Sequence, residues 1–367
     1  MSPIRFDENA DAQVTASAWA AFAYSHTMMD LGKSSQANLE AQKKRFLSNI
    51  SGENYDLYFT SGGTEADAMA LWGTLGYQQG VHVVTTTIEH AAVYKNLDAL
   101  QEISGVCVTK VPARRNGAVI ATDVFTNITN DTYLVSVVLA SNETGVIQPV
   151  SEIARYCRSK NILLHVDAIQ ALGKIPISLE QMQPDLISFS GHKMGSLAGI
   201  GALSVRKGIN FRPPFYAHAC AETEFFPGAA ALVAALENIR YETFDTIQNL
   251  RNDFEQQVST EIPNIEIIGQ GLIRLPNTSC IRFFGCPGEA MMMALDQEGF
   301  AVSTGSACSS GSVQPSQILL GMGLNKKEAR EAVRFSFPNT VTQKALEILV
   351  DKLKAIVQTI RTVDGFI

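Results

Sequence analysis

Short apolar runs alternate with longer helix-like stretches through the first two thirds of the chain, and this alternation constrains the fold most. The apolar runs of strand length are residues 57–60, 81–84, 134–139, 162–166 and 186–189. Helical patterns lie between them at 65–77, 91–102 and 151–160, the last with Ser151 as the expected N-cap. Continuous apolar strands separated by helices predict an α/β fold, in which a mostly parallel sheet is buried on both faces.

The pattern changes from about Tyr241 onward. A polar helix at 245–259, a strand at 278–283 and helices at 287–298 and 343–359 predict a smaller α+β unit. A chain of 367 residues is also longer than one hydrophobic core usually serves. We therefore predict a large domain over residues 15–245 and a small domain formed by residues 1–14 and 246–367.

The composition excludes several classes of protein. Hydrophobic residues make up 46% and charged residues 18%, which argues against a disordered chain. Acidic residues outnumber basic ones by 36 to 29, so the net charge of −7 argues against a nucleic-acid partner. The sequence has no apolar run long enough for a membrane span and no signal-peptide core at its start, so we expect a soluble, cytoplasmic protein with no membrane partner.

The cysteines show neither a disulfide framework nor a metal-binding pattern. The chain has six of them, without a C-x-x-C pair: Cys107, Cys157, Cys220, Cys280, Cys286 and Cys308. Cys280 and Cys286 lack the further cysteines or histidines that would complete a ligand set. We therefore expect no metal site.

Polar and ionisable residues follow each of the five predicted strands. In chain order they are the TSGGTE run at 60–65, Glu89 with His90, Asn142 in an SNETG run, Asp167 with Gln170, and Lys193 in an SGHK run. Ligands of open α/β sheets bind at the carboxyl ends of the strands. We therefore expect these groups to meet at one edge of the sheet.

Together these groups are what an enzyme dependent on pyridoxal 5'-phosphate (PLP) requires. A helix that begins with small residues and a hydroxyl can hold a phosphate dianion. A carboxylate can keep the pyridine nitrogen protonated, and a lysine can form the Schiff base. Taken singly, the same residues are also typical of a helix cap, a loop histidine, a turn carboxylate and a surface lysine. The conjunction favours the PLP site.

Several runs resemble, in the same order, those of cysteine desulfurases, which belong to the class V aminotransferase-like group of PLP enzymes. They are FTSGGTE at 59–65, EHAAV at 89–93, NETGVIQ at 142–148, HVDAIQ at 165–170, SFSGHK at 188–193 with GIGAL at 199–203, and STGSAC at 303–308. The resemblance covers nearly the whole chain. It implies an aspartate aminotransferase-like fold, with a mainly parallel seven-stranded sheet in the large domain and a smaller α+β domain.

The resemblance also implies roles for individual residues. Lys193 would bind PLP as a Schiff base, with Asp167 on the pyridinium and Gln170 on the ring oxygen. His90 would stack on the ring and move protons. Asn142 would contact the cofactor's phenolic oxygen and the substrate, and Arg334 would bind the substrate carboxylate. The residues implied to hold the phosphate are Gly63, Thr64, Ser190 and His192.

Cys308 differs from the other cysteines in its surroundings. It lies among small polar residues at 305–312, the setting of a reactive thiol. The resemblance implies that Cys308 carries a persulfide, so that L-cysteine is converted to L-alanine and the sulfur passes to an acceptor protein for iron–sulfur or cofactor assembly. It also implies a homodimer.

Some family positions are changed, and they leave other functions open. The family's DNAATT run appears as DENADA at 7–12, its Pro-Lys as Leu197-Ala198, and its RSGT run as FPGA at 226–229. The threonine of that last run normally reaches the neighbouring subunit's phosphate. The alternatives are another class V PLP enzyme, such as a selenocysteine lyase or an aminotransferase, or a weakly active paralogue that acts as a sulfur-transfer binding partner. Retention of Cys308 argues against an aminotransferase.

Overall fold

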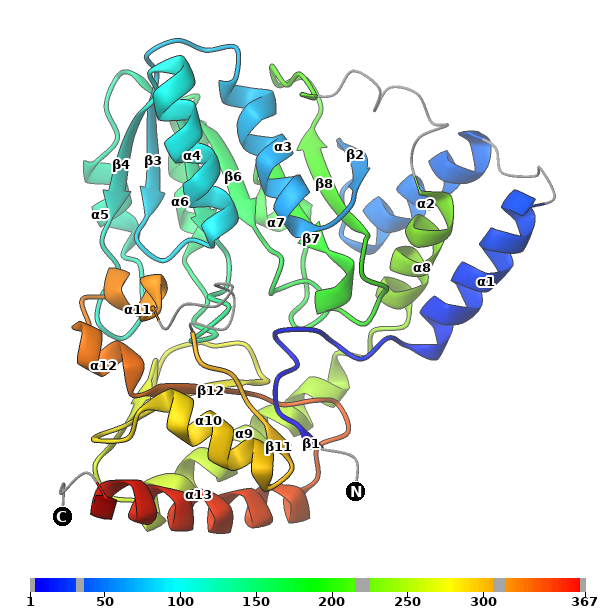
Figure 1. The fold of residues 1–367 in the computed structure, drawn as a ribbon. Helices are drawn as coiled ribbons and strands as arrows, with labels where there is room; N and C mark the ends of the chain where they lie inside the picture. The colour runs from blue at the N-terminus through cyan, green and yellow to red at the C-terminus, as the bar shows by residue number, and fades with distance from the viewer. Residues whose placement is uncertain (1–3, 31–35, 215–224, 306–313, 364–367) are drawn as a thin grey trace.

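A seven-stranded sheet forms the centre of the molecule (Figure 1). The computed structural model describes residues 4–30, 36–214, 225–305 and 314–363. Across the sheet the strands are β2 (Tyr55–Thr60), β8 (Gly201–Arg206), β7 (Leu186–Ser190), β6 (Leu163–Asp167), β5 (Thr132–Val138), β3 (His82–Thr86) and β4 (Cys107–Val111). Only β8 runs against its neighbours within this sheet. The predicted α/β class and the mainly parallel seven-stranded sheet are confirmed.

Helices cover both faces of this sheet, because successive side chains of each strand point to opposite sides. Val83 packs in one hydrophobic cluster with α3 (Gly63–Leu75) and α4 (Ala91–Ser104), which lie in front of the sheet in Figure 1. The next residue, Val84, packs in the cluster on the opposite face. That second cluster includes residues of α1 (Ala16–Asp30), α2 (Gln36–Asn49), α5 (Ala121–Thr126), α6 (Val150–Ser159), α7 (Leu179–Met182) and α8 (Phe226–Glu237).

The start of α6 differs from the prediction. The helix begins at Val150, and Pro149 occupies the N-cap position with no side-chain cap. Ser151 lies exposed in the first turn, so its prediction as the N-cap was wrong. The proline ring holds φ at −78° here, close to the helical value, and the chain enters the helix earlier than the serine suggested.

A smaller unit lies below the large sheet in Figure 1 and has its own core. Its antiparallel sheet has the order β12-β10-β9, and β1 pairs separately with β11. The elements are β1 (Ile4–Arg5), α9 (Glu242–Glu261), β9 (Ile265–Ile268), β10 (Thr278–Phe283), α10 (Gly288–Gln297), β11 (Phe300–Ala301), α11 (Gln317–Gly321), α12 (Lys326–Arg330), β12 (Ala332–Ser336) and α13 (Gln343–Val363). The exact domain boundaries stay a prediction; the one at 245/246 falls in the first turn of α9.

The N-terminal segment joins this smaller unit to the large sheet. Phe6 is fully buried in the smaller unit's core. Farther along, the amide of Ala12 donates to the carbonyl of His192, and the amide of Thr15 donates to that of Gly195. Residues 7–12 therefore cross between the two units, next to the loop that follows β7.

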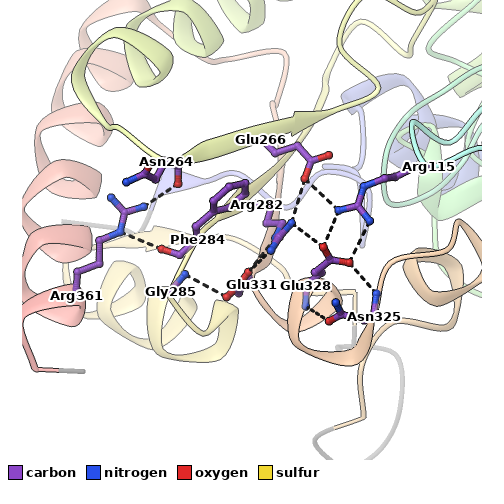
Figure 2. A network of polar contacts seen from close by, with 10 residues as sticks. All are labelled: Arg115, Asn264, Glu266, Arg282, Phe284, Gly285, Asn325, Glu328, Glu331 and Arg361. Carbon is purple, nitrogen blue, oxygen red and sulfur yellow. Dashed lines mark hydrogen bonds and ion pairs between the residues drawn. The ribbon is translucent and has the colours of Figure 1, made fainter. Parts of the chain in front are cut away.

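A network of charged side chains also connects the two units (Figure 2). Arg115, in the loop after β4, donates to both carboxylate oxygens of Glu328 at 3.1 and 2.8 Å. These bonds lower the pKa of Glu328 to about 2. Arg282 of β10 pairs with Glu328, Glu266 and Glu331. Because Arg115 is half exposed, we expect this connection to weaken as salt is added.

No helix within the described part of the chain is long and apolar enough to cross a membrane.

A buried ion pair in the smaller unit gives a test of its stability. Arg274 donates to both oxygens of Glu255 at 2.8 Å, and both residues are buried. Glu255→Gln should lower the free energy of unfolding by about 3 kcal/mol, because it leaves a buried guanidinium without its counter-charge. Glu298→Gln, which breaks the exposed pair with Lys352, should cost less than about 1 kcal/mol. Urea denaturation measures both, and equal losses would contradict the assignment.

Candidate functional site

The loops after the parallel strands open at one edge of the large sheet, on the side of the smaller unit (Figure 1). Strand β2 runs parallel to β7, because both are antiparallel to β8. The loops after β2, β3, β5, β6 and β7 therefore share this edge, as the sequence predicted. They carry the predicted site residues from Gly63 to Lys193.

The first turn of α3 is shaped to receive an anion. Its N-cap, Gly62, makes no side-chain cap, and Thr64 is exposed beside it. The backbone N–H groups of a helix's first turn lack partners within the helix and bind anions well. A Cβ on Gly63 would lie 2.4 Å from Ile169 Cδ1 and 3.1 Å from Ser190 Cβ. This turn therefore packs directly on the loops after β6 and β7, and glycine makes that close approach possible.

Ser190 and His192 lie together beside this turn. Ser190 ends β7, and its Oγ lies 3.0 Å from Nδ1 of His192, which belongs to the short 3-10 helix η1 (Gly191–Lys193). Burial and the nearby Lys193 lower the pKa of His192, with Asp11 opposing them. At neutral pH this imidazole is therefore a neutral hydrogen-bonding group.

Lys193 is partly buried, and backbone carbonyls bind its amine. Nζ donates to the carbonyl oxygen of Asn9 at 2.9 Å and to that of Ala10 at 2.6 Å. Both carbonyls come from the N-terminal segment. The lysine after β7 is thus held by a segment more than 180 residues away in the chain.

His90 lies within electrostatic reach of both Asp167 and Lys193. Burial raises the pKa of Asp167, while the Ile169 amide, which donates to Oδ1 at 2.9 Å, and His90 lower it. His90 caps α4, and its Nδ1 accepts from the Ala92 amide at 3.1 Å. Burial lowers the pKa of His90, and Lys193 acts in the same direction while Asp167 opposes it. A neutral His90 therefore carries its proton on Nε2.

Arg334 reaches the same edge from β12. Its Nη1 donates to the Asn142 carbonyl at 3.0 Å, and its Nη2 donates to Asp7 Oδ1 at 2.5 Å. The structure thus brings Arg334 and Asn142 together. Sequence reasoning missed Asp7 as the partner of this arginine.

Asn9 and Lys174 were also missed. Asn9 is 1% exposed, and its carbonyl accepts from Gln170 Nε2 at 2.9 Å as well as from Lys193. The Asn9 side chain accepts from Lys174 Nζ at 2.9 Å. The altered DENADA run at 7–12 was the signal that could have identified Asn9. Lys174 stands alone among apolar residues at 171–177, and that position could have drawn attention to it.

Further ionisable groups lie buried behind the site. His165 lies between Ser136 and Ser188, at 2.9 and 3.0 Å, and burial lowers its pKa to about 3. Its Nε2 is 3.6 Å from Oδ1 of Asp67, whose pKa is raised by burial and by the charge of Asp167. Burial therefore disfavours the charged form of both side chains.

Cys308 lies in 306–313, outside the described residues, so its predicted role stays a prediction. Two described residues beside that segment contact one carboxylate. Ser316 Oγ donates to Glu143 at 2.6–2.7 Å, and a Cβ on Gly305 would lie 2.3 Å from Glu143 Oε2. Glu143 follows Asn142. Both flanks of the segment thus meet at the edge of the sheet.

Within the described part of the chain, no group of three His, Cys, Asp or Glu side chains is arranged to hold a metal ion.

The chain is similar to known proteins over most of its length. Residues 11–349 match the model of the family described as "Aminotransferase class-V". A cysteine desulfurase of Cereibacter sphaeroides is 35% identical over 343 residues, with 91% of this chain and 88% of that protein covered. Cysteine desulfurase 2 of Trichormus variabilis is 34% identical, with coverage of 100% and 96%.

Solved structures show the same likeness. A NifS-like protein superposes with a TM-score of 0.86 at 27% identity, over 97% of this chain and all of that one. DndA from Streptomyces lividans gives a TM-score of 0.75 at 26% identity, over 89% of this chain and 97% of that one. These relatives span nearly the same length as this chain.

The buried carboxyl of Glu89 predicts a pH dependence of stability. Burial raises its pKa to about 8 from 4.5, against hydrogen bonds from Thr86 and the Val138 amide. The folded state therefore holds this proton between those pH values and the unfolded state does not. Stability should fall as the pH rises through that window, by up to about 1.4 kcal/mol per pH unit.

Glu89→Gln should remove this contribution, whereas Glu242→Gln on the exposed start of α9 should keep it. Urea unfolding of the three proteins between about pH 5 and pH 8, the window between the two pKa values, measures how the free energy of unfolding changes with pH. Identical slopes for wild type and Glu89→Gln would show that Glu89 is ionised in the folded state.

A substitution on β8 tests the expected anion-binding role of the first turn of α3. A Cβ on Gly201 would lie 2.6 Å from the backbone carbon of Gly62, so Gly201→Ala must displace the turn that begins α3. We expect Gly201→Ala to weaken PLP binding about tenfold or more, since the turn's N–H groups would be misaligned. Ser204→Ala on the same strand removes a buried hydroxyl with no hydrogen-bond partner among the described residues and should leave binding unchanged. Titration with PLP measures both, and equal affinities would rule out this role of the turn.

Proposed function

The chain belongs to the class-V aminotransferase family and is a PLP-dependent cysteine desulfurase, and from this premise we propose that Lys193 and Cys308 convert L-cysteine to L-alanine and a protein-bound persulfide. The convergence of Lys193, Asp167 and His90 at the carboxyl edge of the sheet supports this assignment most directly. These are a lysine after β7, a carboxylate at the end of β6 and an imidazole after β3, next to an uncapped helix N-terminus.

The donor set at this edge fits PLP. Asp167 would hold the protonated ring nitrogen, and its burial would make that ion pair strong. The first turn of α3 with Thr64, Ser190 and His192 would hold the phosphate. Lys193 would attach the cofactor, and Gln170 would lie at the ring oxygen. When bound, PLP supplies an electron sink for the negative charge that develops at the substrate's α-carbon.

Lys193 and His90 would manage the protons. The Lys193 amine, once free of the cofactor, would take the proton from the substrate's α-carbon. His90 donates from Nε2 when neutral, because its Nδ1 is occupied by the Ala92 amide. Its lowered pKa keeps it neutral at pH 7, so its Nε2–H would be a hydrogen-bond donor there, and a proton could enter or leave the ring only if the Ala92 contact opens.

Arg334 would bind the substrate carboxylate. It is 7% exposed, and its Nε has no hydrogen-bond partner among the described residues. That donor, together with Nη2, could form a paired contact with a carboxylate if Asp7 shifts. Asn142, whose carbonyl holds Arg334 Nη1, would lie beside the same substrate.

Cys308 would receive the sulfur. Its thiolate would attack the sulfur of the substrate, so that an S–S bond forms as the substrate's C–S bond breaks. The electron pair of the broken bond stays with the substrate carbon, which takes up a proton and leaves as alanine. The contacts of Gly305 and Ser316 with Glu143 support this role, because they anchor the flanks of the Cys308 segment beside Asn142.

We propose a second copy of the chain and a sulfur-acceptor protein as partners. Exposed aromatic residues on α1 support the first: Trp19 is 53% and Tyr24 is 69% exposed. Phe22 of the same helix contacts Trp19 and also Phe225, which is 45% exposed. Exposed apolar side chains that form a contiguous patch mark protein interfaces. The cytoplasmic location stays a prediction.

Three variants test the mechanism. Purified protein is given L-cysteine, and alanine, sulfide and the visible colour of bound PLP are measured. Lys193→Ala should lack the borohydride-sensitive colour of a Schiff base between PLP and the protein, and it should form no alanine. Cys308→Ala should keep the colour, and its rate of alanine formation should fall by about a hundredfold or more. Cys107→Ala, which changes an exposed cysteine of β4, should behave as wild type.

Alanine formation that is unchanged in Cys308→Ala would rule out the persulfide step. A wild-type protein that takes up no PLP would favour the alternative of a non-catalytic sulfur-transfer partner. Faster turnover of L-selenocysteine, which releases selenide, would identify a selenocysteine lyase.

A further inference from the structure

A second lysine lies buried beside Lys193. Lys174, in the loop after β6, is 4% exposed. Its Nζ donates to Oδ1 of Asn9 at 2.9 Å and to Oε1 of Gln170 at 2.5 Å. Both acceptors are neutral amides. The mechanism above gives this buried amine no task.

Asn9 links the two lysines. Its carbonyl accepts from Lys193, and its side-chain oxygen accepts from Lys174, each at 2.9 Å. Gln170 completes the connection, because its Nε2 donates to the same Asn9 carbonyl while its Oε1 accepts from Lys174. The two amines are therefore connected through Asn9 and the side-chain amide of Gln170.

The Asn9 amide is fixed in the orientation that this link requires. Nδ2 donates to Thr278 Oγ1 at 2.8 Å, so Oδ1 faces Lys174. The backbone N–H of Asn9 also donates to Ser336 Oγ at 2.9 Å. The family's DNAATT run has alanine where this chain has Asn9, so the side-chain acceptor belongs to this chain's own DENADA run.

The charges around Lys174 are mainly positive. Burial lowers its pKa to about 7; Lys193 and Arg334 act in the same direction, and Glu8 opposes them. Glu8 is itself partly buried, and burial raises its pKa. Lys174 therefore changes between its charged and neutral forms close to neutral pH.

We propose, resting on the function proposed above, that Lys174 is a positioning residue that keeps Lys193 unprotonated. A charged Lys174 held by Asn9 and Gln170 repels a second positive charge in the same poorly solvated space. Lys193 then holds its amine as a free base. A neutral amine is the form that attacks an aldehyde and that can take a proton from the substrate's α-carbon.

The pH dependence of the visible spectrum of bound PLP tests this proposal. That spectrum reports the protonation of the nitrogen through which the protein holds the cofactor. Lys174→Met removes the charge and keeps an unbranched side chain, and it should raise the midpoint of the spectral change by about one pH unit. Lys174→Arg stays charged throughout the titration and should leave the midpoint at or below that of wild type. Lys326→Met, at an exposed position on α12, serves as the control and should change nothing.

An unchanged midpoint in Lys174→Met would overturn the proposal. An equal rise in Lys174→Met and Lys174→Arg would also overturn it, because packing rather than charge would then be responsible. If Lys174→Met does not fold, Asn9→Ala takes its place. It removes one acceptor from Lys174, disfavours the charged form and should raise the midpoint by a smaller amount; no rise would overturn the proposal.

Lys193→Ala separates this proposal from the one on which it rests. Colour sensitive to borohydride that persists in Lys193→Ala would show that another lysine holds the cofactor, and the proposed function would fail. Loss of colour in Lys193→Ala together with an unshifted midpoint in Lys174→Met would overturn the role of Lys174 alone.

Discussion

The common direction of six strands in the large sheet is the constraint on which the rest of the structure depends. Parallel strands with crossover helices place every strand-to-helix loop at the same edge. Asp167 ends β6, and Lys193 and His90 follow β7 and β3, so the three reach one edge without any long-range motif in the sequence. The apolar clusters on both faces of the sheet fix the strand ends, so the loop residues start from rigid positions.

The N-terminal segment closes this edge and connects it to the smaller unit. Phe6 anchors the segment in the core of the smaller unit, and Asn9 follows three residues later. Nearly every polar group of Asn9 is used in binding another residue, as expected for a polar side chain buried this deeply. A shift of the smaller unit would therefore reach Lys193, Gln170 and Lys174 through a single residue.

Burial controls the charge state of most ionisable groups at the site. It disfavours the charged form of every such group, so His90 and His165 are held neutral while Glu89 keeps its proton at pH 7. Keeping a proton on Glu89, which would be ionised in water at this pH, costs folding free energy, and the large apolar cores offset that cost. The result is an edge where protons can move near neutral pH.

The sequence by itself determined the alternation of strands and helices, the polar residues that follow each strand, and the family resemblance that assigned their roles. Those features are local, and the structure confirms the class of sheet that they predict. The edge strand β4 was not predicted, because a half-exposed strand is not apolar throughout. Only the tertiary structure decided that Asn9 binds Lys174 and that Asp7 binds Arg334, across 165 and 327 residues of chain. No periodicity encodes such contacts, since they depend on how the two units pack against each other.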